Sequence, residues 1–380
     1  MREDSLVILA GSNAYKKVRD QGLKKEDIHV IAGAAGGPKW LVLNGLDRAI
    51  FFSWLGGSKR ERPLFLIGSS IGTWRFAAIA QRHAEDAYNM FQDAYINQSY
   101  SQRPTPEEVS QEARRMLSAY LDQKGIEDIL ANPYMRINIM ATLSRPIVSM
   151  ENTKLLWPPV VAAALLNAVN RKYIGLFFER TLFYDKRDRP PFFSMNAFPI
   201  HRVPLSEKNL RQAILASGSI PIVMQGIKDI PGAPPGMYRD GGIIDYHLDI
   251  PFTKDTNSIV LFPHYMGRVT PGWFDKHLKF RGPDPMHLEN LLLLCPSRSF
   301  IERLPYSKIP TRDDFKLFKG RDSQRIRYWE RVVEESKRLG DEFLDAVEKG
   351  SIGDKVKKLG VRNQAPGAGH QAPGKTGERV

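Results

Sequence analysis

The sequence predicts an α/β fold, a three-layer sandwich in which a central, mostly parallel sheet is flanked by helices. Apolar runs of strand length alternate with helical patterns through the first two thirds of the 380 residues. Two of these runs, residues 27–32 and 63–67, stop at a glycine and lead directly into a helical pattern. In α/β folds, binding sites lie at this end of the strands.

Helices are expected behind both strands. Behind the first, Pro38 suits the first helical position, because its missing N–H needs no partner there. The apolar residues that follow would then share one face, namely Leu41, Val42, Leu46, Ala49 and Ile50. Behind the second strand, a helix is expected from Ile71 towards Ala80.

The rest of the chain contains further elements of both kinds. Strands are expected at residues 135–140, 192–196 and 258–262, and a long helix at 106–124. An amphipathic helix is expected from Asp322, with an Asp or Ser as its N-cap and with Ile326, Trp329, Val333, Leu339 and Phe343 near helical spacing. We expect this helix to pack across the main domain.

Length and composition favour one domain with additions. Because single cores stop growing at about 250 to 300 residues, the length fits one large domain or two medium ones. Residues 1–350 are assigned to one main domain with additions. Beyond Gly353 the apolar content falls, and the tetrapeptide Gln-Ala-Pro-Gly at 364–367 recurs at 371–374. Such Gly/Pro-rich sequence cannot bury enough apolar surface to offset the entropy of ordering. Residues 351–380 are therefore expected to form a disordered tail.

Several classes of protein are excluded. A single cysteine, Cys295, excludes a disulfide framework and a thiolate metal cluster, and we expect it to be buried. The N-terminus lacks the pattern of a secretory signal. The longest apolar tract, residues 155–169, contains Pro158 and Pro159 and is too short to span a membrane. We therefore expect a cytoplasmic protein without a transmembrane segment.

The formal net charge is +13. A basic surface attracts polyanions, either nucleic acid or anionic lipid headgroups. No zinc finger, helix-turn-helix or RNP motif is evident, so nucleic acid is not expected as a partner. The basic residues of the last helix, Arg325, Arg327 and Arg331, are expected on a solvated face.

Residues 68–72 read Gly-Ser-Ser-Ile-Gly, a G-x-S-x-G pattern between a predicted strand and a predicted helix. In this context the pattern is typical of a nucleophile elbow. Ser70 would stand on a tight, strained turn with its hydroxyl accessible, and Gly68 and Gly72 would permit the close packing that this turn needs. The alternative is a glycine-softened turn in which Ser70 caps the helix.

Residues 33–39, Gly-Ala-Ala-Gly-Gly-Pro-Lys, follow the first predicted strand. Their N–H groups would point to the same end of the sheet as the serine turn, so Gly36, Gly37 and Ile71 are candidate donors of an oxyanion hole. Nucleotide binding fits poorly, because a P-loop needs Ser or Thr where this chain has Trp40, and the dinucleotide fingerprint is absent. Close packing of helix against sheet is the alternative role for this loop.

Asp240 lies in Tyr-Arg-Asp-Gly-Gly, a segment that on its own is typical of a turn. Taken in order, the glycine loop, the serine pentapeptide and this Asp-Gly-Gly resemble the patatin-like phospholipases. Gly45-Leu46 and residues 216–221, Ala-Ser-Gly-Ser-Ile-Pro, add to the similarity. The resemblance covers a motif-bearing core of about residues 28–252 and leaves 253–350, a helical extension, without a counterpart.

The resemblance implies a patatin-like fold and an acyl hydrolase that acts on lipid esters, phospholipids among them. It also implies a Ser-Asp dyad, in which Ser70 is the nucleophile and Asp240 accepts its proton. The chemistry agrees, because a carboxylate with an ordinary pKa of about 3.9 serves as a base only when it is positioned and partly desolvated. No metal or cofactor is implied.

The chain departs from the family pattern at several positions. Ala35 replaces a glycine, Lys39 an arginine and Trp40 another glycine, and residues 245–247 stand where an asparagine is common. These changes concern substrate preference and loop geometry more than the type of reaction. Lys39 is a candidate contact for an anion.

Two other interpretations stay open. A Ser-His-Asp triad of the α/β-hydrolase type would use His247 or His264 as its base, although neither histidine has a local signature. A non-catalytic lipid-binding or scaffolding protein would keep the same fold. No metal-ligand spacing of His or Cys is present, so no metal is expected. The sequence leaves the oligomeric state open.

A lipid substrate held in a bilayer requires contact with the interface. Residues 157–166 form an apolar stretch, followed by Ile174, Phe177, Phe178, Thr181 and Leu182, beside the basic residues Arg171, Lys172 and Arg180. One interpretation is an apolar surface rimmed by positive charge, which predicts peripheral contact with an anionic membrane. The other is an ordinary core helix.

Overall fold

A computed structural model describes residues 4–57 and 60–360 of the chain. In this part of the chain, eleven strands form one sheet. In order across the sheet they are β11 (Val356–Lys358), β1 (Leu6–Ala10), β10 (Leu291–Pro296), β9 (Ile259–Pro263), β2 (Ile28–Gly33), β3 (Leu64–Ser69), β4 (Met135–Ser144), β5 (Phe178–Tyr184) and β6 (Ile200–Pro204), with β8 (Met237–Asp240) beside β4 and β7 (Ile227–Lys228) beside β8. Antiparallel pairs occur at β1/β10, β4/β5, β4/β8 and β7/β8, and the other pairs are parallel.

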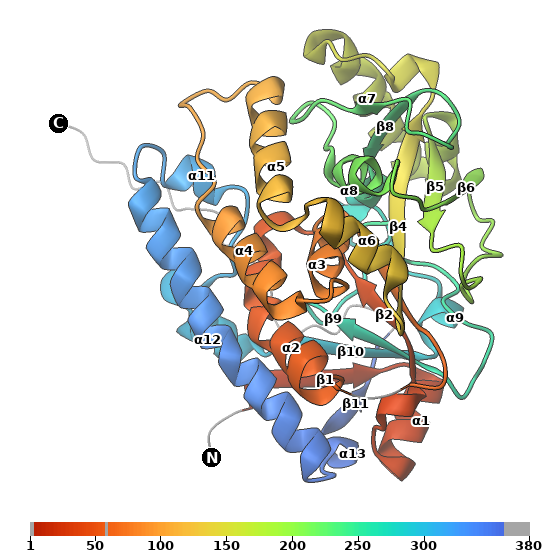
Figure 1. Cartoon of the computed structure of the whole chain (residues 1–380), viewed down its shortest axis with the longest axis vertical. Coiled ribbons are helices and arrows are strands. Elements are labelled where there is room, and N and C mark those ends of the chain that lie inside the picture. The colour runs from red at the N-terminus through yellow and green to blue at the C-terminus, as the bar shows by residue number, and fades with distance from the viewer. Residues whose placement is uncertain (1–3, 58–59, 361–380) are drawn as a thin grey trace.

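The helices surround this sheet (Figure 1). They are α1 (Ser12–Gln21), α2 (Asn44–Arg48), α3 (Ile71–Ile79), α4 (Ala84–Ile96), α5 (Pro106–Tyr120), α6 (Gln123–Ala131), α7 (Thr153–Val169), α8 (Leu210–Gly218), α9 (Pro285–Leu288), α10 (Arg298–Arg303), α11 (Asp314–Leu317), α12 (Asp322–Glu348) and α13 (Ile352–Lys355). The predicted α/β class, with a mostly parallel sheet flanked by helices, is confirmed.

Four of the five strands predicted in the sequence match β2, β3, β4 and β9 within a few residues. The fifth prediction, residues 192–196, is wrong, because this segment is a turn and the next strand is β6. Its apolar side chains Phe192 and Met195 are buried, as they would be in a strand. Its carbonyl groups, however, accept hydrogen bonds from the guanidinium of Arg202, at Phe193 (2.6 Å) and at Met195 (2.7 Å), in place of a neighbouring strand.

Two helix predictions need correction. The segment behind Pro38 begins as a 3-10 helix, Gly37–Leu43, before it becomes α2. The helix predicted at 106–124 is two helices, because Leu121 is extended and Asp122 starts α6 by accepting a 2.7 Å hydrogen bond from the Gly125 amide. An aspartate in this position ends one helix and caps the next.

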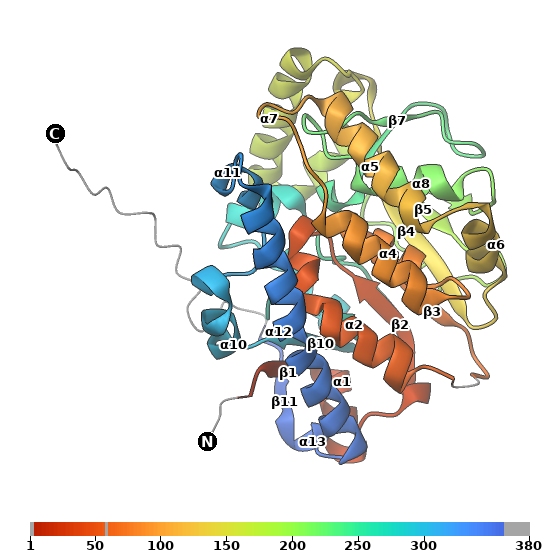
Figure 2. The same cartoon turned by 60° about the vertical axis from the view of Figure 1, so that its left-hand side comes forward.

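Helix α12 starts at Asp322 as predicted and lies along α2 (Figures 1 and 2). The residue at its N-cap position is Arg321, which provides no side-chain cap, so the predicted Asp or Ser cap is wrong. The two helices approach closely at Gly45 and Gly340, where a Cβ on either glycine would overlap the backbone of the other helix. Arg325, predicted on a solvated face, is buried and donates a 3.0 Å hydrogen bond to the carbonyl of Ile96.

The tail predicted for residues 351–380 begins too early. Residues 352–358 form α13 and β11, and β11 adds to the sheet in parallel with β1. Ile352 and Val356 are buried, and this burial holds the segment at the edge of the sheet. Residues 361–380 of the predicted tail lie outside the described residues.

Two predictions about apolar segments agree with the structure. Cys295 is buried in β10, and burial raises the pKa of its thiol to about 12. Within residues 4–57 and 60–360, we find no helix with the length and apolar character needed to cross a bilayer.

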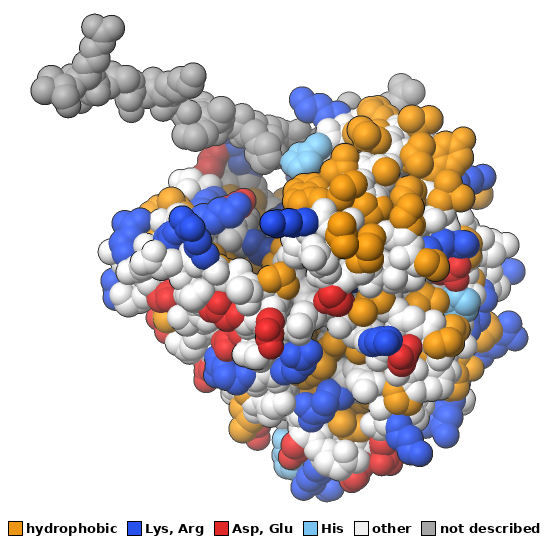
Figure 3. All heavy atoms as spheres, turned by 90° about the horizontal axis from the view of Figure 1, so that it is seen from above, with side chains coloured by type: hydrophobic (Ala, Val, Ile, Leu, Met, Phe, Trp, Pro, Cys, Tyr) orange, Lys and Arg blue, Asp and Glu red, His pale blue; other side chains and the backbone are white. Residues whose placement is uncertain are grey.

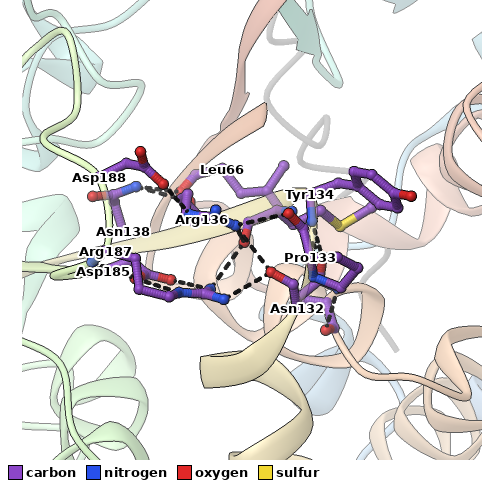
Figure 4. Close-up of polar contacts among 11 residues, drawn as sticks. Leu66, Asn132, Pro133, Tyr134, Arg136, Asn138, Asp185, Arg187 and Asp188 are labelled. Atoms are coloured by element: carbon purple, nitrogen blue, oxygen red, sulfur yellow. Dashed lines mark hydrogen bonds and ion pairs between the residues drawn. The ribbon is translucent and has the colours of Figure 1, made fainter. Parts of the chain in front are cut away.

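Strand β4 is fixed at its start by a network of arginines (Figure 4). Arg136 donates to Oδ2 of Asp188 at 2.5 Å and to the carbonyl of Asn132 at 2.9 Å. Arg187 donates to the same carbonyl at 2.8 Å. These bonds hold the turn before β4 and therefore fix where the strand begins.

From that start, β4 sets the register of two other strands. Its residues 135–140 pair with β3, and its residues 141–144 pair with β8 on the same edge. Met140 lies opposite Ser69, and the next residue, Ala141, lies opposite Asp240. Strand β4 thus brings the end of β3 and the end of β8 together.

Candidate active site

Ser70 occupies the turn between β3 and α3 with a positive φ, 54°, and a ψ of −125°. Such a backbone costs a non-glycine residue about 1 to 3 kcal/mol and is typical of functional sites. The two flanking glycines are required by close packing. A Cβ on Gly68 would lie 2.5 Å from the amide nitrogen of Thr73, and one on Gly72 would overlap the carbonyl of Gly33. Strand, turn and helix have the geometry of the predicted elbow.

Ser217 links the turn at Ser70 to strand β4 by hydrogen bonds. Its hydroxyl donates to the carbonyl of Met140 at 2.7 Å and accepts a 2.9 Å hydrogen bond from the amide of Ser70. Because the only proton of this hydroxyl goes to Met140, Thr73 must be the donor in its 2.9 Å bond to Ser217. Ser217 belongs to the small-residue segment at 216–221. The resemblance seen in the sequence included that segment but predicted no role for Ser217.

Asp240 ends β8 and faces the serine. Its Oδ2 accepts a 2.8 Å hydrogen bond from the hydroxyl of Ser70, and its Oδ1 accepts a 2.7 Å bond from the amide of Gly242. The carboxyl group is buried, and this burial raises its pKa above the ordinary value, against the opposing effect of the positive charge of Arg312. Asp240 is thus a stronger base than an exposed aspartate.

The loop after Asp240 is held against β4. A Cβ on Gly241 would overlap the carbonyl of Met140, so only glycine allows this approach. The amide of Asp245 donates to the carbonyl of Gly241 at 2.8 Å. The carboxylate of Asp245 forms a buried, bidentate ion pair with Arg180 of β5, at 2.7 and 2.8 Å. This ion pair holds the loop that follows Asp240, while Asp240 itself is held by the pairing of β8 with β4.

The glycine loop borders the same pocket as the serine. Gly36 lines a cavity together with Ser70 and Asp240. Gly37 and Ile71 line an adjoining groove, which Ser70 also borders. The three predicted oxyanion donors therefore lie around the serine.

Tyr265 orients this loop. Its hydroxyl donates a 2.7 Å hydrogen bond to the carbonyl of Ala35. Its ring lies against Gly36, where a Cβ would be 2.6 Å from Cε1. In a trans peptide the carbonyl and the following amide point in opposite directions. The bond to Ala35 therefore turns the Gly36 amide away from Tyr265.

Both candidate histidines of a triad are buried behind the glycine loop. His247 accepts a 2.9 Å hydrogen bond at Nδ1 from the amide of Thr270, so its proton is on Nε2, which donates to the Tyr265 hydroxyl at 2.6 Å. His264 places Nδ1 2.7 Å from the carbonyl of Met266. Burial lowers the pKa of both rings, that of His264 to about 3. Within the described residues, neither ring forms a hydrogen bond with the serine or the aspartate of the site.

Two cations that no sequence motif indicated line the cavity. Arg312 precedes α11, and Lys276 lies in the short helix Trp273–His277, where its Nζ is 4.4 Å from the ring centre of Tyr246. Burial lowers the pKa of Lys276, and the nearby charge of Arg312 adds to this. Lys39, the predicted anion contact, is half-buried with its Nζ 4.7 Å from the ring centre of Tyr265.

The cavity at Ser70 is small and the groove beside it is large. The cavity holds about 30 Å³, room for at least one water molecule. The groove holds about 670 Å³ and runs from the serine along α5. Apolar side chains line much of it, among them Ile71, Trp74, Val109, Met116, Ile220 and Met224. Charged side chains of both signs also border it, namely Arg312, Lys316, Lys319, Asp313 and Asp322, and Lys316 lies 3.9 Å from Asp313.

The fold and the site together define an α/β protein in which a strained serine donates to a buried aspartate beside a glycine loop. No family model and no curated protein matches the chain. Among solved structures, the chain is similar to VipD from Legionella pneumophila, with 9% sequence identity and a TM-score of 0.30 over 69% of this chain and 53% of VipD. The chain thus spans about half the length of VipD. A likeness at this level says nothing about the chemistry of the site.

Proposed function

We propose that this protein is a serine acyl-ester hydrolase of patatin-like type that acts on lipid esters through a dyad of Ser70 and Asp240. The observation that carries the proposal is the 2.8 Å hydrogen bond from the Ser70 hydroxyl to Asp240, made by a serine whose backbone is strained. A nucleophilic serine needs a base within hydrogen-bond reach and a turn that exposes its hydroxyl. Asp240 supplies the base, and Ser70, although only 3% exposed, lines both the cavity and the groove.

In the proposed reaction, Asp240 takes the hydroxyl proton of Ser70 as Oγ attacks the ester carbonyl. The amides of Gly36, Gly37 and Ile71 stabilise the oxyanion of the tetrahedral intermediate. Its collapse breaks the ester C–O bond, and the leaving alcohol takes the proton from Asp240. Water then gives a proton to Asp240 and attacks the acyl-serine, and the second collapse returns that proton to Ser70 and frees the acid. These steps use no metal or cofactor.

The electrostatics of the pocket support this chemistry. The raised pKa of Asp240 makes it a better proton acceptor than an ordinary carboxylate, and the positive charge of Arg312 opposes this rise by favouring the ionised form. Arg312 and Lys276 border the same cavity and would favour the negative charge that develops on the carbonyl oxygen. Lys276 is half-buried and Arg312 is exposed, so water screens the charge of Lys276 less than that of Arg312.

The groove supports a lipid as the substrate. Its apolar lining suits an acyl chain, and its charged lining, in which Arg312, Lys316 and Lys319 outnumber Asp313 and Asp322, suits a polar headgroup that carries negative charge. A phospholipid carries both features, and other acyl lipids carry the first. We further propose that the enzyme is cytoplasmic and reaches its substrate by peripheral contact with a membrane.

The test is reaction with a fluorophosphonate serine probe, followed by hydrolysis of p-nitrophenyl butyrate. We expect the wild-type chain to react, and Ser70→Ala and Asp240→Asn to lose both labelling and activity. The matched control is Ser69→Ala, since the hydroxyl of Ser69 is buried and has no hydrogen-bond partner among the described residues. This variant should keep both.

Other results would favour the competing interpretations. A wild-type chain that neither reacts with the probe nor hydrolyses esters would indicate a non-catalytic lipid-binding protein. If His247→Gln or His264→Gln lost activity as completely as Ser70→Ala, a histidine and not Asp240 would be the base. We expect both histidine variants to retain labelling.

A further inference from the structure

Helix α7 presents a row of large apolar side chains to the outside. Leu155, Trp157, Val161, Leu165, Leu166 and Val169 are between 37 and 76% exposed. Tyr173 and Leu176, in the turn that follows, are also exposed. Figure 3 shows hydrophobic side chains gathered on the upper face of the molecule, the face at which Figure 1 places α7. Contiguous exposed apolar side chains of this kind mark a surface that binds a protein or a membrane.

The inner face of α7 is buried against the rest of the protein. Leu156, Val160 and Ala163 pack in a second, smaller apolar cluster with Ile243 and Ile244, which lie in the loop after Asp240. Other residues predicted for an exposed apolar surface are in fact buried: Ile174, Phe177, Phe178, Thr181 and Leu182. Arg180, predicted for its basic rim, is buried in its ion pair with Asp245. The apolar exterior is therefore α7 and the turn behind it.

Within residues 152–178 the charged side chains are all positive, and the exposed Glu151 precedes this stretch. Residues 152–178 contain no aspartate or glutamate, and their charged residues are Lys154, Arg171 and Lys172. Lys154 and Lys172 are exposed, whereas Arg171 forms an ion pair with Asp275 at 3.4 Å. An apolar strip whose exposed charged side chains within residues 152–178 are lysines fits an anionic lipid surface, because both hydrophobic burial and charge attraction favour it.

Two features favour a helix that lies in the plane of the interface. Pro158 and Pro159 provide no N–H for the carbonyls of Lys154 and Leu155, which in an uninterrupted helix would accept from these positions. Water at a membrane interface can supply those hydrogen bonds, and a hydrocarbon core cannot. Trp157 and Tyr173 are of the two residue types enriched at the membrane–water boundary.

We propose that the outer face of α7, together with Tyr173, Leu176 and Lys172 behind it, docks on a bilayer that contains anionic lipid. The docking does not depend on hydrolase activity. Because the inner face of α7 shares a cluster with Ile243 and Ile244, docking would bring the Asp240 loop close to the lipid surface.

The experiment measures binding of the full chain carrying Ser70→Ala, which cannot consume the lipid. The vesicles are pure phosphatidylcholine, or equal parts of phosphatidylcholine and phosphatidylglycerol. We expect sedimentation with the mixed vesicles and much less with the neutral ones. Adding Trp157→Glu and Leu165→Glu should weaken binding at least about tenfold, because each places a charge in the apolar strip that the bilayer would cover. The matched control is Met90→Glu on α4, another exposed apolar position, which should bind unchanged.

A second measurement covers the case in which the double variant fails to fold. The one native cysteine, Cys295, is buried, so Leu165→Cys can be labelled selectively with an environment-sensitive dye. Its emission should shift to the blue on mixed vesicles, and that of Met90→Cys should not. Equal binding by Trp157→Glu/Leu165→Glu and Met90→Glu, or no dye shift, would overturn the proposal. A dimer in solution that the double variant converts to a monomer would show that the face binds a second copy instead.

Discussion

The Ser70 hydroxyl donates a hydrogen bond to Asp240 although 170 residues separate the two in the chain. Their meeting follows from β4, in which Met140 lies opposite Ser69 and Ala141 lies opposite Asp240. The two side chains are therefore adjacent because two strands end at consecutive positions on one edge of a third. The pair is built into the sheet, and its geometry does not depend on a mobile loop.

The pH dependence of activity should report the ionisation of Asp240. A base must be ionised to accept a proton, so kcat/KM for p-nitrophenyl butyrate should fall as pH drops through the raised pKa of this aspartate. The positive charge of Arg312 lowers that pKa. Arg312→Gln should therefore move the acid limb to higher pH. Lys316→Gln, a change farther along the groove, should leave it in place. An unmoved limb in Arg312→Gln would contradict the assigned base.

Tyr265→Phe should lower kcat about tenfold with little change in KM, because the Gly36 amide loses its orientation while the groove stays intact. The matched control is Tyr328→Phe. Tyr328 is equally buried, and its hydroxyl also donates a 2.7 Å hydrogen bond to a backbone carbonyl, that of Lys308. Tyr328→Phe should lose about 1 kcal/mol of unfolding free energy, and Tyr265→Phe about 2 kcal/mol, because His247 Nε2 also loses its acceptor. Equal activities of the two variants would show that Tyr265 is only structural.

Ser217→Ala should destabilise the fold by about 2 kcal/mol, because the Ser70 amide and the Met140 carbonyl lose their buried partner together. Denaturation by urea measures the change. Ser219→Ala is the comparison, since that hydroxyl is also buried but makes one bond, to the carbonyl of Leu215. It should cost about half as much. A smaller loss of unfolding free energy in Ser217→Ala than in Ser219→Ala would show that the hydrogen bonds of Ser217 to Ser70 and Met140 do not stabilise the turn.

Backbone strain at Ser70 is measurable by comparing Ser70→Gly with Ser70→Ala. Both variants lack the hydroxyl, so both leave Asp240 without that partner. Only glycine adopts a φ of 54° without a Cβ penalty. The free energy of unfolding of the glycine variant should therefore be about 1 kcal/mol higher than that of the alanine variant. Equal stabilities in thermal and urea unfolding would mean that the turn is not strained.

The local parts of the site could be predicted from sequence. The glycines around Ser70 could be recognised because the strand, turn and helix that they join are consecutive in the chain. The contact of Gly68 with Thr73 is local, whereas that of Gly72 is with Gly33 in β2. The Asp-Gly-Gly segment could be recognised from its residue types, although the contact that requires Gly241 is with the carbonyl of Met140 in β4. The segment at 192–196 shows the limit, because its aromatic residues are buried as in a strand while Arg202 takes the carbonyl groups.

The sequence by itself determined the alternation of strands and helices, the serine turn, the glycine loop and the candidate aspartate, because each is encoded in a few consecutive residues. The tertiary structure alone decided that these segments meet, and that Arg312, Lys276 and Tyr265 complete the pocket. It also decided which face of the apolar helix α7 stays outside. The physical reason is that register against β4 and burial against distant helices depend on contacts between residues far apart in the chain, which no local pattern records.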